Sequence, residues 1–115
     1  MTLGSKQKAF SRLVAKLITD LYHRGYEVTF SEAWRSPETC ALYAKQGRGI
    51  AGSLHQHRLA IDLNLFKDGE FLTMTQDYKE MGEIWEGYST EEFECCWGGR
   101  FDDGGHVSIG HGGVR

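Results

Sequence analysis

Residues 52–66, GSLHQHRLAIDLNLF, decide the fold, because two histidines and an aspartate stand in a run that otherwise resembles a buried strand. Alternation over a strand predicted at residues 57–66 places four apolar side chains on one face: Leu59, Ile61, Leu63 and Leu65. Asp62 shares the other face with Ala60 and Asn64, so its carboxylate can look into a cleft. An unpaired buried charge is costly, and a cation is the simplest compensation for Asp62.

A second group of polar residues lies far along the chain, where glycines separate its members. Its acids and histidines are Asp102, Asp103, His106 and His111. Glycines permit tight turns, which let side chains three positions apart converge. Two histidines and one carboxylate that leave a coordination position open are typical of a catalytic zinc site, and a further acid can move protons. Spacing alone leaves open whether His55 or His57 joins Asp62, and which of the two neighbouring aspartates is the proton-transferring group.

The N-terminal half is predicted to hold two helices and a strand. Apolar residues at helical spacing predict a helix over residues 6–24 that ends at Gly25. Alternation predicts a strand over residues 26–34. In SPETCALYAKQG, Ser36 is the expected N-cap of a second helix and Pro37 its first residue.

The remaining segments do not continue a regular alternation of helix and strand. They are a glycine-rich loop at 47–53, a turn at 67–70 leading to a strand at 70–73, a helix starting at Thr75 or Gln76, and a short strand at 106–109. We therefore expect an α+β fold with a small, largely antiparallel sheet flanked by helices.

Composition is that of one globular domain covering residues 1–115, with 40% hydrophobic and 12% aromatic residues. The net charge of −3 does not favour a nucleic-acid partner. No apolar run has the length of a membrane span and no leader precedes the first helix, so we expect a cytoplasmic chain. We also expect a monomer. Three cysteines, among them the neighbours Cys95 and Cys96, lack CxxC spacing and are expected to be reduced packing residues.

Four motifs together resemble a known family. SLHQHRLAIDL resembles the SxHxxGxAxD signature of the M15 zinc peptidases, which cut peptidoglycan peptides, and DDGGH resembles the family's acid placed three residues before its third metal ligand. WRSPE resembles the family's arginine-bearing element, and YAKQGR is similar to the branch that cleaves L-alanyl-D-glutamate bonds and includes phage endolysins. The four motifs run in the family's order from about residue 34 to residue 106.

The resemblance implies a zinc DD-peptidase (hedgehog-like) fold and a site with one catalytic Zn²⁺. The implied zinc ligands are His55, Asp62 and His106. Asp103 would be the catalytic acid and base, and Arg35 would contact the substrate carbonyl or carboxylate. Ser53 would support the ligand loop and join Gln46 in binding the substrate.

Two residues depart from the family pattern. Arg58 stands where the signature usually has glycine, which could alter the backbone between two ligands. Val107 follows the last histidine where an aromatic residue is common, which changes only a wall of the cleft.

Other residues have a structural alternative. His111 is expected at the surface or beside the ligands, and Trp97 in the core or the cleft wall. Arg35 has the alternative of an ion pair with Glu32 or Glu38.

The implied function is hydrolysis of the L-alanyl-D-glutamate bond of peptidoglycan stem peptides by a phage endolysin without a separate wall-binding domain. Such an enzyme waits in the host cytoplasm until lysis and then acts on the cell wall. The alternatives are a D-alanyl-D-alanine carboxypeptidase or dipeptidase, and a zinc-binding module of the same fold without turnover. A binding module has no need of an acid at Asp103, so the sequence favours an enzyme.

Overall fold

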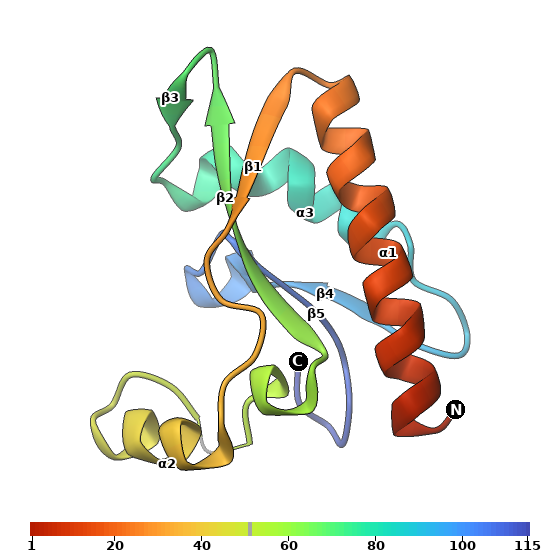
Figure 1. Cartoon of the computed structure of the whole chain (residues 1–115), viewed down its shortest axis with the longest axis vertical. Coiled ribbons are helices and arrows are strands. Elements are labelled where there is room, and N and C mark those ends of the chain that lie inside the picture. The colour runs from red at the N-terminus through yellow and green to blue at the C-terminus, as the bar shows by residue number, and fades with distance from the viewer. Residues whose placement is uncertain (51) are drawn as a thin grey trace.

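The sheet is organised around β2 (Ala60–Lys67) in the computed structural model of the chain (Figure 1). β2 lies between β1 (Tyr26–Phe30) and β5 (His106–Ile109), and β5 also pairs with β4 (Cys95–Trp97). β3 (Glu70–Phe71) forms a hairpin with the end of β2. Every one of these pairings is antiparallel, which confirms the predicted α+β class and its small antiparallel sheet.

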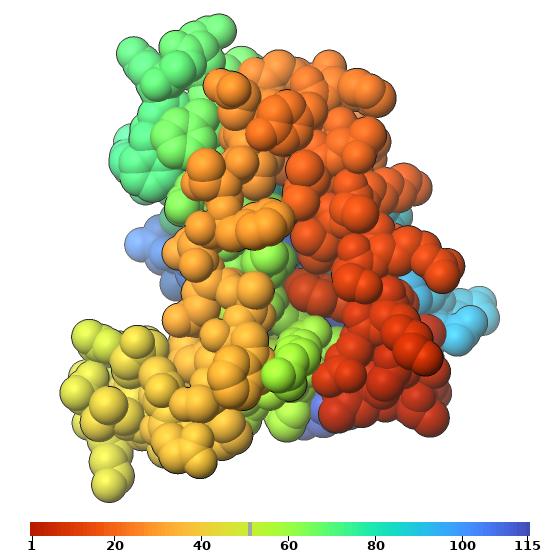
Figure 2. Space-filling view, viewed as in Figure 1, coloured from red at the N-terminus to blue at the C-terminus, as the bar shows by residue number. Residues whose placement is uncertain are grey.

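Three α-helices accompany the sheet within the described part of the chain, residues 1–50 and 52–115. Helix α1 (Leu3–His23) runs beside β1, and α3 (Lys79–Glu86) packs against β4. Helix α2 (Pro37–Lys45) projects from one corner of the molecule (Figures 1 and 2). None of the helices in these residues has the length and apolar character needed to span a bilayer.

The core forms between α1 and the apolar face of β2. Alternation along β2 is confirmed, because its four predicted core residues are at most 6% exposed: Leu59, Ile61, Leu63 and Leu65. The α1 side chains that meet them are Phe10, Val14, Leu17 and Leu21. Burial of each such side chain contributes about 1.5–3 kcal/mol. Because β2 is also paired on both sides, it is a firm support for a site.

Local signals mark the ends of the helices as predicted. Gly25, just after α1, has φ of +90°, a left-handed conformation that glycine adopts at little cost. The hydroxyl of Ser36 accepts a hydrogen bond of 3.0 Å from the backbone N–H of Thr39, which caps α2 ahead of Pro37. Residue 51 of the predicted glycine-rich loop lies outside the described residues.

Several predicted boundaries are wrong. The strand expected from residue 57 begins at Ala60, because Leu54–His57 forms a short 3-10 helix. The strand expected over residues 26–34 ends at Phe30. Two backbone hydrogen bonds, between Asp62 and residues Ser31 and Glu32, continue the pairing with β2 beyond that end. β4 was not predicted, since three residues are too few to show a period.

The helix expected from Thr75 or Gln76 also begins later. Thr75–Tyr78 forms a 3-10 helix and α3 starts only at Lys79. The hydroxyl of Tyr78 donates to the carbonyl of Leu72 and accepts from the N–H of Leu65, so this turn is tied to β2.

Candidate metal centre

Three side chains from separate elements converge at one end of β2. His55 belongs to the 3-10 helix Leu54–His57, Asp62 to β2, and His106 begins β5. Asp62 and His106 are directly opposite in the β2–β5 register, so their side chains share a face. Oδ1 of Asp62 lies 3.2 Å from Nδ1 of His106 and 3.4 Å from Nε2 of His55. The three potential ligand atoms lie within 4.8 Å of one another.

The two distances around Asp62 match the spacing of ligand atoms about a tetrahedral metal ion. Ligand bonds of about 2.0–2.1 Å place neighbouring ligand atoms of a tetrahedron roughly 3.3–3.4 Å apart. The distances of 3.2 and 3.4 Å around Asp62 are close to that edge length. Two imidazoles and a carboxylate are a zinc donor set that leaves a fourth position for water or substrate.

The position of His55 is set by the turn that carries it. Its side chain is almost fully buried, and its backbone N–H donates to the hydroxyl of Ser53 at 3.2 Å. Arg58 then adopts φ of +56°, and Leu59 donates to the carbonyl of Leu54, so the chain reverses into β2. Arg58 therefore takes the left-handed conformation that a glycine at this position would take easily, and the ligands stay together.

The alternative ligand His57 lies outside the cluster. Its ring packs edge-on against that of His111 with centroids 5.7 Å apart. Nδ1 of His111 is 3.2 Å from Nζ of Lys6, at a separate surface of the molecule. The structure thus brings His55 and not His57 to Asp62.

Asp62 stays ionised over a wide pH range. Burial alone would raise the pKa of Asp62, but hydrogen bonds and charges from His106 and His55 outweigh it and hold this pKa far below its ordinary value. A carboxylate that is ionised at neutral pH is ready to bind a cation.

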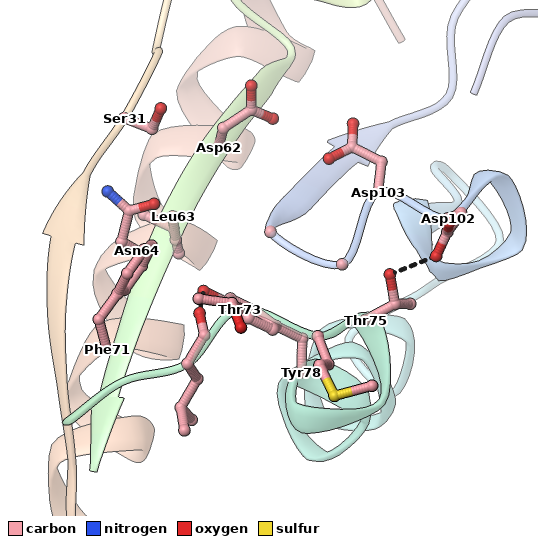
Figure 3. Close-up of a pocket in the computed structure, with 14 residues that line it drawn as sticks. Ser31, Asp62, Leu63, Asn64, Phe71, Thr73, Thr75, Tyr78, Asp102 and Asp103 are labelled. Carbon is pink, nitrogen blue, oxygen red and sulfur yellow. Dashed lines mark hydrogen bonds between the residues drawn. The ribbon is translucent and has the colours of Figure 1, made fainter.

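Asp103 lies beside the three converging residues, with Oδ2 3.9 Å from Nδ1 of His106. Partial burial and the negative charge of Asp62 raise the pKa of Asp103 above its ordinary value, which suits a group that exchanges protons. Figure 3 shows Asp103 facing Asp62 across the cleft, whereas Asp102 turns towards Thr75 and accepts a hydrogen bond of 2.7 Å from its hydroxyl.

The loop of Asp103 depends on the glycines that follow it. A Cβ on Gly105 would lie only 2.6 Å from the carbonyl oxygen of Leu63, closer than two such atoms approach. The indole of Trp97 donates to the carbonyl of Gly104 at 2.7 Å. Trp97 therefore fastens the loop while its side chain packs against the core, the first of its two predicted positions.

Two cavities flank Asp62 and Asp103, and both are of a size common for ligand sites. The first, of about 360 Å³, is called the Asn64 cavity for its uncharged polar groups, Ser31, Asn64, Thr73 and Thr75 (Figure 3). The second, of about 380 Å³, is called the arginine cavity for Arg35, Arg48 and Arg115. In Figure 2 the left edge of the molecule is indented between the β2–β3 end and the α2 segment.

The predicted substrate-binding residues are placed differently from one another. Arg35 and Ser53 line the arginine cavity beside the cluster. The guanidinium of Arg35 also forms an ion pair with Glu32, the structural alternative given above. The ion pair and a position beside the cluster are therefore compatible. Gln46 is the exposed C-cap residue of α2 and lines neither cavity.

Sequence reasoning missed two arginines of the cavity. Arg48 stands in YAKQGR, the motif from which only Gln46 was selected, so a basic side chain there was the available signal. Arg115 reaches the cavity from the end of the chain and pairs with Glu94 at 2.9 Å, a contact for which the sequence carries no signal.

The fold and the cluster define an α+β domain with a candidate metal site in an open cleft. A solved structure with a similar fold is the crystal structure of the Serratia marcescens L-Ala D-Glu endopeptidase ChiX, with a TM-score of 0.66 and 20% sequence identity. The similarity covers 87% of this chain and 79% of that one, and at this identity it shows the shared fold. No protein-family model and no curated protein matches the chain.

Proposed function

We propose that this chain is an M15-type zinc peptidase that hydrolyses the L-alanyl-D-glutamate bond of peptidoglycan stem peptides. The observation that carries the proposal is the convergence of His55, Asp62 and His106 beside a further acid, Asp103, whose Oδ2 lies 3.9 Å from Nδ1 of His106. The fold that this chain shares with an L-Ala D-Glu endopeptidase, together with the motifs resembling that branch, supports this substrate.

In this proposal His55, Asp62 and His106 hold the ion. When bound, zinc supplies the Lewis acidity that makes water a usable nucleophile near neutral pH. Asp103 accepts the proton of the attacking water on its carboxylate and returns a proton to the departing amine. Its raised pKa favours both transfers, because a general acid–base group works best when its pKa approaches the working pH.

Arg35 is proposed to donate hydrogen bonds to the carbonyl oxygen on which negative charge develops. Its guanidinium is held in advance by Glu32 and by the ring of Tyr43, with Cζ 4.9 Å from the ring centroid. A donor fixed before the reaction loses little entropy when charge develops, and removing such a donor costs on the order of 100-fold in rate.

We also propose that the protein acts as a phage endolysin that reaches the cell wall at lysis. The support is the similarity of YAKQGR to the branch that includes phage endolysins. Loss of optical density from bacteria whose outer barrier has been opened measures this role directly.

The first experiment compares neighbouring acids of one loop. The zinc-loaded protein is incubated with purified sacculi, and mass spectrometry identifies the bond cut. We expect Asp103→Asn to keep zinc and lose roughly 100-fold or more in turnover. Asp102→Asn is the matched control, because Asp102 turns away from the cluster and asparagine tolerates its left-handed backbone. His106→Ala should lower bound zinc as well as activity, and a chelator should abolish turnover until zinc is returned.

Other results would redirect the proposal. Release of terminal D-alanine would favour a carboxypeptidase or dipeptidase, and stoichiometric zinc without any cleavage would favour a binding module. Full turnover by Asp103→Asn, or by protein verified to be free of metal, would contradict the mechanism.

A further inference from the structure

The two cavities beside the metal centre differ in charge. Among the described residues, those that line the Asn64 cavity include no lysine or arginine. The arginine cavity is lined by three arginines, Arg35, Arg48 and Arg115, and both cavities share the acids Asp62 and Asp103. A substrate that spans the cleft therefore meets positive charge on one side only.

The three arginines are not equally available to a ligand. Arg35 is paired with Glu32, and Arg115 is paired with both carboxylate oxygens of Glu94 at 2.9 and 3.2 Å. Arg48 has no carboxylate partner among the residues that the structure describes, and its side chain is exposed. Of the three, Arg48 is the guanidinium whose charge is not already compensated.

Tyr43 orients Arg48 towards the cavity. Cζ of Arg48 lies 4.2 Å from the centroid of the Tyr43 ring, and the backbone N–H of Arg48 donates to the carbonyl of Tyr43 at 2.8 Å. A guanidinium stacked on an aromatic ring keeps its planar set of donors free for a carboxylate. Because the side chain is ordered beforehand, less conformational entropy is lost when an anion binds.

We propose that Arg48, held by Tyr43, binds a free carboxylate of the substrate and so selects stem peptides whose glutamate α-carboxyl group is not amidated. This inference rests on the proposed function. In an L-alanyl-γ-D-glutamyl peptide the alanine carbonyl is part of the bond that is cut, so the nearest free carboxylate belongs to glutamate. Arginine binds a carboxylate with two parallel charge-assisted hydrogen bonds, whereas a primary amide offers one acceptor and no charge.

The test uses two synthetic muramoyl tripeptides that differ only in this group, one with D-glutamate and one with D-isoglutamine. For the zinc-loaded wild-type protein we expect kcat/KM to be about 10- to 100-fold higher for the free acid, the range of a charged hydrogen bond. Arg48→Gln should lower kcat/KM for the acid and leave the amide nearly unchanged, so that the ratio approaches one. Arg115→Gln is the matched control and should keep the wild-type ratio, because Glu94 already compensates Arg115.

Tyr43 is a positioning residue in this proposal. Because Arg35 packs on the same ring, Tyr43→Leu should lower kcat for both substrates, and through Arg48 it should in addition raise KM for the acid and so reduce the acid-to-amide ratio. Tyr43→Phe, which keeps the ring, should restore the ratio. A role of Tyr43 that does not involve Arg48 would leave the ratio unchanged.

Equilibrium binding separates failure of this inference from failure of the proposed function. Calorimetry with zinc-loaded Asp103→Asn measures the affinity of both peptides without turnover. Acid-selective binding that requires Arg48, in a wild-type protein that cuts neither peptide, would overturn the proposed function and support the carboxylate site. Equal affinity for both peptides, no binding of either, or a ratio that Arg115→Gln abolishes and Arg48→Gln does not, would overturn the inference.

Discussion

The two chain segments that supply the metal centre are held in place by different means. Residues 53–62 contain no glycine, and the ligand-bearing turn is anchored by Leu54 and Leu59, both almost fully buried. Residues 97–106 carry paired glycines at both ends of the Asp103 loop. There a Cβ on Gly98 would lie 2.4 Å from the carbonyl oxygen of Asp103.

This difference indicates which changes each segment tolerates. The first segment is fixed by buried apolar side chains, so its backbone can hold even an arginine in a left-handed conformation, at Arg58. The second is fixed by close backbone contacts, so an added methyl group has no space.

Gly105→Ala should break the second segment. The added Cβ would meet the carbonyl of Leu63 at 2.6 Å, so the loop must shift, at a cost of about 1–3 kcal/mol. Because the loop carries Asp103 and His106, turnover should fall by roughly 100-fold as well. Urea unfolding and sacculus hydrolysis measure the two effects. Gly4→Ala is the control, since a Cβ there has no atom within 4 Å, and equal stability of both variants would contradict the contrast.

Alkaline pH should weaken the strand that anchors the second segment. Burial raises the pKa of Cys95 to about 12 and that of Cys96 to about 11. Their ordinary value is near 9, so above that pH the unfolded chain loses thiol protons before the folded protein does. The stabilisation is complete below pH 9 and declines as the pH rises towards 11–12, by roughly 1.4 kcal/mol per thiol and pH unit.

Urea midpoints at pH 8 and pH 10 measure this decline. The double variant Cys95→Ala/Cys96→Ala should lose less stability between the two pH values than the wild type does, because the remaining titrating groups are common to both. The same loss in both proteins would show that these thiols do not hold β4 in the way described.

Substitutions of Arg58 test whether the first segment holds a left-handed residue at a cost in stability. Arg58→Gly and Arg58→Ala both remove the guanidinium that lies 4.8 Å from the Trp34 ring centroid. They differ in backbone freedom, because φ of +56° is unfavourable for any residue with a Cβ. The glycine variant should be more stable than the alanine variant by about 1 kcal/mol in urea unfolding. Zinc content should be alike in the two, and a more stable alanine variant would contradict the left-handed turn.

Local patterns were sufficient for much of the fold. The apolar period of α1, the Ser36 cap of α2 and the alternation along β2 depend on neighbours in the chain, and the structure confirms each of them. The types of residue that form the site, two imidazoles and a carboxylate with a further acid, could also be named from the sequence.

Contacts between distant segments were beyond such patterns. The turn at Arg58 points His55 to Asp62 and His57 to His111, and β4 exists because β5 offers it an edge. Pairing also decides which arginine keeps a free charge. The ion pair of Arg35 with Glu32 is local and could be named from the sequence, whereas Glu94 reaches Arg115 only once the chain is folded. Helix propensity and hydrophobic periodicity depend on residues a few positions apart in the chain. The geometry of a ligand set and the compensation of a charge depend on all the groups that folding brings close in space, whatever their distance in the sequence.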